Sequence, residues 1–385
     1  MSLEDKLEVV HRASSESDRE AVFHFRYQVY IEELKRTYQG QDSERRRLHD
    51  EEDDAEDAVL FYTGSVDNIT SAARVRTWGP GRIPELNYIR LSLDRFEGID
   101  KLNVAEVTRL MIRPNVRGKF LLPSLIIRGY EYLAAETGSD LAFFQCIPGL
   151  VHHFRKLGAR PYGGALIEGG SSTLVPSVLV LSDYNYLREC GSFLANYLKK
   201  YFFGPGKRRP LDTSAFEHVM LGHTVPLELD SLKIWDEIQD QLMQNENELP
   251  SYLDALPKDA VKQIAAWGFL LNVSAGDLLT KKGTMEREMY LVLDGNFAVM
   301  SENDHINTLV KGDLFGEIAF YLKSGQRTAS VKALTPGRVL VINHNFLKKL
   351  IHTDPDAAWQ IMMNIGRIMA ERLASMLSSA AGRAA

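Results

Sequence analysis

Residues 312–331 read GDLFGEIAFYLKSGQRTASV, and this stretch decides the fold of the C-terminal third of the chain. Around it, short apolar runs alternate with Gly-Asp turns at 276–277 and 312–313, and Asp294-Gly295 signals a β-hairpin. Short strands with regular glycine turns are typical of an all-β roll or barrel. Farther on, residues 356–378 repeat Ala, Met and Ile at helical spacing. The sequence therefore predicts a β-roll with a terminal α-helix over residues 250–385.

Two charged residues of this stretch are suited to hold a sugar and a phosphate. Glu317, when ionised, only accepts hydrogen bonds and so matches a ribose hydroxyl, whereas Arg327 offers a planar fork of donors to a phosphate. Gly316 lets the backbone come close to a ligand. Such charge-assisted bonds contribute about 1.5–3 kcal/mol each. In an empty roll the same two residues would form a plain ion pair, but we favour a binding site because both stand in a complete motif.

The stretch resembles the phosphate-binding cassette of cyclic-nucleotide-binding domains, as found in catabolite activator proteins and cAMP-dependent kinase regulatory subunits. The resemblance covers about residues 250–377 and includes Lys282-Gly283 and the run 289–295. It implies that Glu317 holds the ribose and Arg327 the phosphate. It further implies that Thr328 and the backbone of Gly316 and Ile318 support them.

The terminal helix raises two further questions. Polar residues of this helix contact the purine in the activators, whereas this chain has Met376-Leu377 there, with Ser375 and Ser378 as possible substitutes. The ligand is therefore expected to be cAMP, with cGMP as the alternative. The helix would either form the seam of a homodimer or pack only on its own roll. Its apolar residues at helical spacing are Ala358, Ile361, Met362, Ile365, Ile368, Met369 and Met376.

The totals limit the other classes of function. The chain has 385 residues and a formal net charge of −6, which argues against a protein that mainly binds nucleic acid. The activators continue into a DNA-binding module, whereas this chain stops at Ala385, so no DNA partner is expected. Cys146 and Cys190 form neither a disulfide framework nor a zinc motif, and no metal is expected. Without a signal sequence or an apolar run of spanning length, we expect a cytoplasmic protein with no membrane span.

The first half of the chain alternates strand and helix patterns. Strands are predicted over 58–62, 71–78, 104–112, 141–146 and 177–181, and helices over 18–34, 122–136 and 150–157. Ser17 and Glu20 would form the capping box of the first helix. This pattern indicates an α/β or α+β domain over residues 1–203, and we expect the α+β form, a mixed sheet with flanking helices. Residues 204–249 would be a linker, with a basic connector at 204–210 that could instead bind phosphate, and a helix over 230–245.

Four motifs in this half resemble acyl-homoserine-lactone synthases and the related N-acyl amino acid synthases, which are relatives of the GNAT-type N-acetyltransferases. They are FRYQVY at 25–30, DEED at 50–53, ARVRT at 73–77 and EVTR at 106–109. The resemblance implies aminolysis of an acyl thioester by an amine, with an amino acid as one candidate acceptor. The acyl donor would be an acyl-carrier protein or acyl-CoA.

The motifs supply the candidate residues for this reaction. Glu106 is the candidate base, acting directly or through water, because the amine must lose a proton. Arg74, Arg109 and Arg26 would hold a carboxylate or position Glu106. The two aspartates of the second motif, Asp50 and Asp53, would bind the acceptor ammonium or order the N-terminal helices. The alternative is a buried structural ion network of these side chains.

The acyl thioester is expected at Arg117-Gly118-Lys119, which resembles the pyrophosphate turn of acetyltransferases. Phe120 and Leu122 replace later small residues of that turn, which leaves room for a long acyl chain. Phe154 stands where acetyltransferases often place a tyrosine, and the neighbouring His153 could serve instead. The sequence thus predicts a cyclic-nucleotide-regulated N-acyltransferase. A cAMP-regulated protein lysine acetyltransferase and a non-enzymatic cAMP-binding module remain alternatives, and the direction of regulation stays open.

Overall fold

The computed structural model describes residues 7–114, 121–162, 166–168, 173–220, 268–302, 304–342 and 344–383, and positions 253, 255–257, 259–260 and 264. The chain divides into two compact units, residues 1–222 and 223–385. Each unit is described by itself. The helix predicted over residues 230–245 lies outside the described residues.

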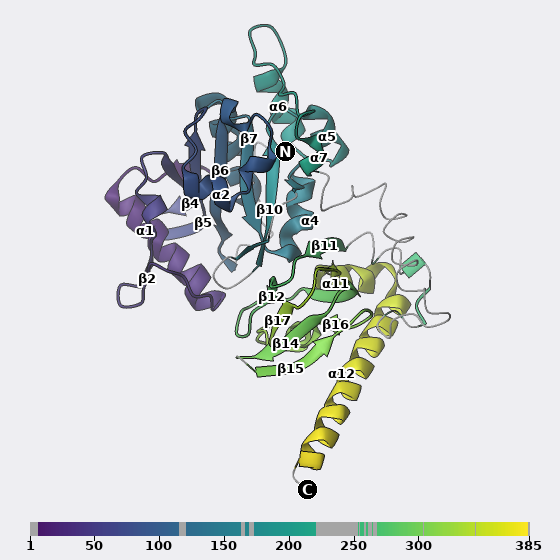
Figure 1. The fold of residues 1–385 in the computed structure, drawn as a ribbon. Coiled ribbons are helices and arrows are strands. Elements are labelled where there is room, and N and C mark those ends of the chain that lie inside the picture. Colours follow the sequence, from purple (N-terminus) through teal and green to yellow (C-terminus); the bar gives the residue numbers. More distant parts are fainter. Residues whose placement is uncertain are drawn as a thin grey trace. The chain divides into compact units, whose positions relative to one another are not determined.

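The first unit is built on one mixed sheet (Figure 1). Its strand order is β1 (Val10–Arg12), β4 (Ala58–Ser65), β5 (Asn68–Trp78), β6 (Val104–Ile112), β7 (Leu141–Cys146), β10 (Thr173–Val180) and β8 (Arg160–Pro161), with β9 (Ile167–Glu168) paired to β10. Only β6 and β7 run parallel, and their pairing covers Val104–Val107 and Leu141–Phe144. Because β6 continues to Ile112, the two strands are paired only along the first part of β6.

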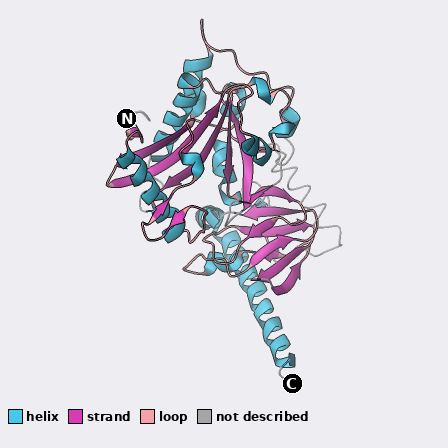
Figure 2. Ribbon diagram, turned by 60° about the vertical axis from the view of Figure 1, so that its left-hand side comes forward, coloured by secondary structure: helices cyan, strands magenta, loops and turns pink. Residues whose placement is uncertain are grey.

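Helices cover both faces of this sheet (Figure 2). α1 (Glu16–Tyr27) packs on the face that carries Leu60 and Tyr62 of β4, whereas α3 (Leu121–Glu131) and α6 (Leu194–Phe202) pack on the face that carries Val59 and Phe61. Alternate residues of one strand point to opposite faces, so β4 supplies both cores. The predicted mixed sheet with flanking helices is confirmed.

The remaining elements of the first unit are short. The strands are β2 (Gln41–Asp42) and β3 (Arg47–Leu48), and the α-helices are α2 (Glu85–Arg90), α4 (Val151–Lys156), α5 (Tyr184–Glu189) and α7 (Glu217–Met220). The 3₁₀ turns are η3 (Glu51–Asp53), η4 (Leu93–Arg95), η5 (Ile99–Lys101) and η8 (Pro148–Leu150), and the π-helical ends are η2 (Gln28–Glu33) after α1 and η7 (Tyr132–Glu136) after α3.

One local prediction for the first unit is wrong, and the compact unit extends beyond residue 203. The capping box of α1 is formed by Ser15 and Asp18 rather than by Ser17 and Glu20, because the helix begins earlier, at Glu16. The unit also continues past residue 203, where the sequence placed its end. Phe216 and Met220 are buried in the same cluster as Phe143, since these apolar side chains complete the core at that edge of the sheet.

The second unit contains two four-stranded antiparallel sheets. One has the order β11 (Phe269–Val273), β18 (Gly337–Ile342), β13 (Met289–Asp294) and β16 (Leu314–Phe315), and the other β12 (Leu278–Thr280), β17 (Ser330–Ala333), β14 (Phe297–Ser301) and β15 (Asp304–Leu309). The helices are α10 (Glu317–Tyr321), α11 (His344–Thr353) and α12 (Pro355–Arg383). The predicted β-roll with a long terminal helix is confirmed.

Three glycine turns carry the chain from one sheet to the other. Gly276, Gly295 and Gly312 have φ of 97°, 88° and 91°, a region that glycine occupies without strain. They connect β11 to β12, β13 to β14 and β15 to β16, and each pair of strands lies in different sheets. The hairpin predicted at Asp294-Gly295 is therefore wrong. A turn signal shows that the chain reverses, but the packing of the two sheets decides which strands pair.

The first half of α12 packs on its own roll. Ala358, Ile361, Ile365 and Ile368 are buried in a cluster with residues of the sheet β11-β18-β13-β16 and of α11. On the outer face, Trp359, Met363, Leu373 and Leu377 are between 48% and 63% exposed. Within the part of the chain that the structure describes, no helix is both long and apolar enough to cross a membrane.

Candidate functional site

The predicted nucleotide cassette contains a glycine, Gly316, that no other residue can replace without a shift of its neighbours. Gly316 follows β16 and precedes α10, with φ of 84°. A Cβ atom at this position would lie 2.5 Å from Arg327 Nη1 and 2.7 Å from the carbonyl oxygen of Glu288. The absence of a side chain therefore allows Arg327 to reach across the backbone, and it brings two of the predicted residues into contact.

Arg327 is almost completely buried, with 3% exposed. Its Nη1 donates to the carbonyl oxygens of Glu288, at 2.8 Å, and Gly316, at 3.0 Å. Nη2 lies 3.4 Å from the Glu288 carboxylate, and Nε lies 3.7 Å from the Glu286 carboxylate. The guanidinium is held by two acidic residues that precede β13, which the sequence analysis did not identify. Within the described part of the chain, Nε has no hydrogen-bond partner although it is buried, so the guanidinium retains donor capacity.

Glu317 is bound by an arginine from the terminal helix. Arg372 Nη1 donates to Glu317 Oε1 at 2.8 Å, and its Nη2 donates to the carbonyl oxygen of Leu314 at 2.6 Å. Glu317 is 2% exposed, so its charge is shielded from water and paired. Glu317 and Arg327 thus each have a different partner instead of forming the ion pair considered above. Arg372 is a site residue that sequence reasoning missed, because one cation in a long helix carries no distinguishing pattern.

The other residues of the predicted cassette are at the surface. Ile318 is 38% exposed on α10, and Thr328 is exposed directly after the buried Arg327. The structure therefore brings Gly316, Glu317 and Arg327 together below a surface on which Ile318 and Thr328 lie.

In the first unit, the predicted arginines and aspartates form one network. Arg26 Nη1 lies 2.7 Å from both carboxylate oxygens of Asp53, and both side chains are buried. Arg74 contacts Asp53 at 3.1 Å and also pairs with Asp50. Arg109 Nη2 lies 2.6 Å from Asp50 Oδ2. These five predicted residues are therefore connected by ion pairs, although they come from α1, the turn at η3, β5 and β6.

The network lowers the pKa of both aspartates. Burial alone raises the pKa of Asp50, but the charges of Arg74 and Arg109 outweigh burial and lower it to about 2. Burial likewise raises the pKa of Asp53, and the charges of Arg26 and Arg74 lower it below its usual value. Both carboxylates are therefore ionised at neutral pH.

Arg109 lies at a β-bulge. Its φ is 55°, and the register between β5 and β6 shifts between Ala72 and Arg74. A bulge turns a side chain away from the regular alternation, and a left-handed conformation at a residue other than glycine is strained. The guanidinium of Arg109 consequently lies over the rings of Tyr38, at 4.8 Å, and Tyr30, at 5.7 Å.

Glu106 is held by four donors that the sequence analysis did not assign. Arg90 donates to Oε1 at 2.7 Å and to Oε2 at 2.8 Å, Asn87 donates at 3.1 Å, and Gln145 of β7 donates at 3.3 Å. Arg90 and Asn87 both lie on α2. A carboxylate has about four acceptor positions, so Glu106, which is 1% exposed, is saturated.

Glu52 connects Glu106 to the rest of the network. Arg90 Nη2 lies 3.3 Å from Glu52, which also pairs with Arg74. The ion pairs are therefore continuous from Arg109 to Glu106, and the structure has the buried ion network that the sequence left open beside a catalytic role. Glu52 and Arg90 are about one-third exposed and are the part of this network nearest to solvent.

The sequence analysis also singled out a thioester-binding turn and the residues Phe154 and His153. Arg117, Gly118 and Lys119 lie outside the described residues. Phe154 of α4 packs against Phe144 at a centroid distance of 5.0 Å, and His153 is exposed. Phe144 is the last residue of β7 that pairs with β6, so Phe154 lies next to the point where β6 and β7 cease to pair.

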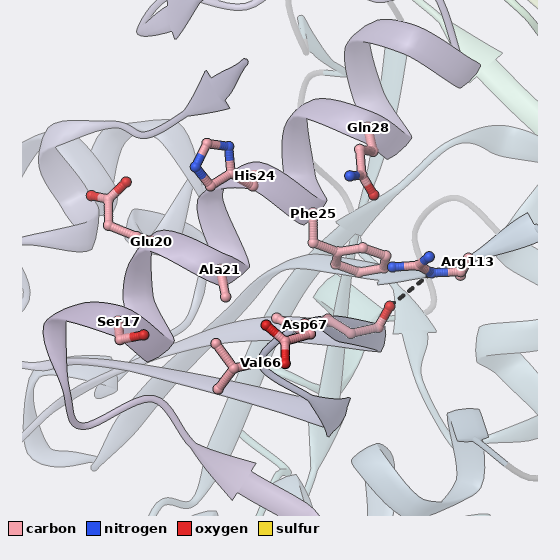
Figure 3. A pocket seen from close by; sticks show the side chains of 10 residues that line it. Ser17, Glu20, Ala21, His24, Phe25, Gln28, Val66, Asp67 and Arg113 are labelled. Atoms are coloured by element: carbon pink, nitrogen blue, oxygen red, sulfur yellow. Dashed lines mark hydrogen bonds between the residues drawn. The ribbon is translucent and has the colours of Figure 1, made fainter. Parts of the chain in front are cut away.

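A separate hollow of about 310 Å³ lies beside α1 (Figure 3). Phe25 and Arg113 line it, and Arg113 Nε donates to the carbonyl oxygen of Ile69 at 2.8 Å, with its guanidinium 5.5 Å from the Phe25 ring. Of the predicted site residues that the structure describes, none lines this hollow. Among the described residues, no three His, Cys, Asp or Glu side chains gather as a metal site would require.

Two family models match different parts of the chain. The model of the N-acyl amino acid synthase FeeM matches residues 21–180, and that of the cyclic nucleotide-binding domain matches residues 270–354. The Drosophila melanogaster cGMP-dependent protein kinase, isozyme 1, is 25% identical over 116 residues, which are 30% of this chain and 14% of the kinase. The chain spans 14–30% of the length of this kinase and of the cyclic nucleotide-gated channels of Ictalurus punctatus and Gallus gallus that it matches.

Two solved structures match the two units. FeeM from uncultured soil microbes is 18% identical and has a TM-score of 0.37, and the match covers 49% of this chain and 97% of that chain. A cyclic nucleotide-binding domain from Methylobacillus flagellatus is 16% identical with a TM-score of 0.35, covering 40% of this chain and 85% of that chain. The chain thus joins a FeeM-type N-acyl amino acid synthase domain, over residues 21–180, to a cyclic nucleotide-binding domain over residues 270–354.

Proposed function

We propose that this protein is an N-acyltransferase whose activity is regulated by a cyclic nucleotide. The observation that carries the proposal is that Glu317 and Arg327 are both buried beside Gly316, each held by protein groups that a sugar-phosphate ring can replace. The acyltransfer part rests on the FeeM-type domain in the same chain.

The ligand that we propose is cAMP, with cGMP as the competitor to be tested. Its ribose hydroxyl would donate to Glu317, and its phosphate would accept from the guanidinium of Arg327, including the buried Nε. A phosphate would replace Glu286 and Glu288 as the partner of Arg327. Thr328 and the backbone of Gly316 and Ile318 would complete the site.

The contact between Glu317 and Arg372 would transmit the binding event. A ribose hydroxyl at Glu317 competes with Arg372 or shares the carboxylate with it, and either outcome changes how α12 is held. A coupling of about 1–3 kcal/mol is usual between two ligand sites in one protein. Nucleotide binding would therefore alter acyl transfer by a factor of about 5–150.

The reaction would be aminolysis of an acyl thioester. The amine nitrogen attacks the carbonyl carbon, the C–S bond breaks, and the thiol leaves with a proton. Because Glu106 is saturated, the amine or a water can reach it only by replacing one donor, and Gln145, at 3.3 Å, forms the longest of these bonds. We propose that the acceptor takes the place of Gln145 and that Glu106 then accepts its proton.

Burial divides the arginine–aspartate network into two roles. Arg26 and Asp53 are at most 1% exposed, so we assign them to ordering α1 and η3. Arg109 and Asp50 are 16% and 21% exposed, so we assign them to the carboxylate and the ammonium of an amino-acid acceptor. Arg74 pairs with both aspartates and would thereby fix the position of the partly exposed pair relative to the buried pair.

The acyl donor would be an acyl-carrier protein or acyl-CoA, held at Arg117, Gly118 and Lys119, which precede α3 in the sequence. One observation favours the alternative of a non-enzymatic binding module. Phe154, beside Phe144, has no hydroxyl to protonate a leaving thiolate. A protein lysine acetyltransferase is the second alternative.

The outer face of α12 supports a homodimer. Trp359, Met363, Leu373 and Leu377 follow the alternating spacing of four and three that forms a coiled-coil seam, with Gly366 and Ala370 between them. These residues differ from the predicted seam, most of which is used in the packing of α12 on its own roll. We propose that a second copy covers the outer face.

The decisive experiment combines calorimetry with product analysis. Titration of the full chain with cAMP and cGMP should show binding of one nucleotide per chain, tighter for cAMP. Incubation with acyl-CoA or acyl-carrier protein and a mixture of amino acids, with and without cAMP, should yield N-acyl amino acids by mass spectrometry. Binding without any acylated product would leave only the binding module, and acylated lysine in a substrate protein would favour the acetyltransferase.

A further inference from the structure

The segment between Cys190 and Leu211 carries positive charge without any negative charge. It contains Lys199, Lys200, Lys207, Arg208 and Arg209 and no Asp or Glu, in a chain whose formal net charge is −6. It follows the part of the chain that the FeeM model matches. Arg208 Nη2 lies 2.5 Å from Asp140, so the segment that the sequence predicted as a linker is anchored to the first unit.

Aromatic rings lie among these cations. Phe203, which follows α6, is 47% exposed, and its ring lies 5.3 Å from that of Tyr184. Lys199 and Arg188 stand over the Tyr184 ring at 5.1 Å and 5.7 Å. The loop that follows carries two more exposed cations, Lys207 and Arg209. We use the name basic tip for the surface that comprises Tyr184, Arg188, Lys199, Phe203, Lys207 and Arg209.

The charges of the basic tip are available to an external partner. Two neighbouring cations are already used, because Lys200 lies 3.5 Å from Glu131 and Arg208 is bound to Asp140. For Lys207 and Arg209, by contrast, the described ranges of the chain provide no ion pair, and both side chains are exposed. The basic tip therefore presents uncompensated positive charge.

The shape of the basic tip favours a flat partner over a small molecule. Figure 1 shows α6 leading into a loop that projects from the first unit, and residues 203–207 are all exposed. Small ligands prefer concave sites. A half-exposed aromatic ring on a surface that also carries cations matches a lipid surface, where the ring enters the headgroup region and the cations meet anionic phosphates.

The position of the basic tip separates it from the acyl-donor region. Asp140, which anchors Arg208, directly precedes β7, whereas β6 and β7 cease to pair after Phe144. The four residues between the two places span about 13 Å at 3.3 Å per residue. A carrier protein that delivers its thioester to the end of the paired region would thus not need to dock at the basic tip.

We propose that the basic tip attaches the protein peripherally to an anionic lipid bilayer. The test is sedimentation of the full chain with vesicles of phosphatidylcholine, alone or with about 30% phosphatidylglycerol, at low and at high salt. The protein should bind only the anionic vesicles and lose binding as salt rises. The combined change Lys199→Gln, Lys207→Gln and Arg209→Gln should weaken binding about 100-fold, since each cation contributes about fivefold.

The matched control is the combined change Lys311→Gln, Lys332→Gln and Lys348→Gln, which removes three exposed cations of the second unit and should leave binding unchanged. Phe203→Ser should weaken binding even at the salt concentration at which the wild type is still bound. All variants change exposed residues, and unchanged circular dichroism verifies their fold. Absence of vesicle binding at low salt, or equal loss in both triple variants, would overturn the proposal. Release of the protein from vesicles by a short single-stranded RNA would assign the basic tip to nucleic acid instead.

Discussion

Arg372 Nη1 lies 2.8 Å from Glu317 Oε1 and so ties the terminal helix α12 to the nucleotide cassette, 55 residues earlier in the chain. The same guanidinium donates to the carbonyl oxygen of Leu314, which lies in β16 of the roll. The carboxylate that is expected to bind the ribose is therefore also the attachment point of the helix. This arrangement joins the cassette and the helix through one buried carboxylate.

Removing Arg372 should destabilise the second unit. Arg372→Gln leaves Glu317 buried without its cationic partner and should lower the free energy of unfolding by about 1–3 kcal/mol. In a Glu317→Gln background the same change should cost less, because no buried charge is left unpaired. Urea denaturation of the wild type and the three variants measures this difference. Equal costs of Arg372→Gln in both backgrounds would show that the contact contributes nothing to stability.

Changing Arg327 should weaken nucleotide binding selectively. Arg327→Lys keeps a positive charge near Glu286 and Glu288 but loses the fork of donors, so cAMP affinity should fall by about 10- to 100-fold in calorimetry. The exposed change Lys332→Gln should leave affinity within about twofold. Wild-type affinity in a folded Arg327→Lys protein would remove this residue from the phosphate site.

The low pKa of Asp50 predicts a pH-dependent stability. Its pKa is about 2 in the folded protein and near 3.8 in the unfolded chain, so its contribution is fully present above about pH 4 and is lost as the pH falls towards 2. Asp50→Asn should therefore cost about 2 kcal/mol at pH 7 and progressively less below pH 4. Urea denaturation between pH 3 and 7 measures the cost, using Asp100→Asn on the surface as the control. A cost that does not vary with pH would contradict the predicted role of Arg74 and Arg109.

Glu106→Gln separates catalysis from structure. If Glu106 accepts the proton of the amine, kcat for acyl transfer should fall by about 100- to 10,000-fold, while cAMP affinity at the second unit stays unchanged. Glu97→Gln, at an exposed position, is the matched control. Undiminished turnover in Glu106→Gln would exclude it as the base, and the pH dependence of kcat in a partly active variant would show whether a titrating base has been lost.

The outer face of α12 should control the oligomeric state. Leu373→Glu with Leu377→Glu places like charges in the proposed seam and should convert a dimer to a monomer in light scattering, because both positions are exposed in the single chain. Lys348→Glu, on α11, is the control for added negative charge. A monomeric wild type, with and without cAMP, would contradict the proposed pairing.

Local patterns in the sequence were sufficient to predict both folds and most of the strands. The alternation of short apolar runs with Gly-Asp turns indicated the roll, since glycine adopts the positive φ that these turns need, and Gly276, Gly295 and Gly312 all adopt it. The helical spacing of Ala358, Ile361 and Ile365 likewise indicated a buried helix face. Such signals depend on neighbouring residues only and can therefore be read along the chain.

Pairing between distant residues was decided by the tertiary structure. The turn at Asp294-Gly295 does not form a hairpin, and Ser15 rather than Ser17 caps the first helix. The partners of the two central carboxylates, Arg372 for Glu317 and Arg90 for Glu106, were not apparent from the sequence. Many arginines in a chain are chemically equivalent, and only the packing of elements far apart in sequence brings one of them to a buried carboxylate. The sequence by itself thus determined which chemical groups are present and which local structures they form, whereas the fold decided which groups face one another, because burial removes water and leaves each charge to the partner that packing provides.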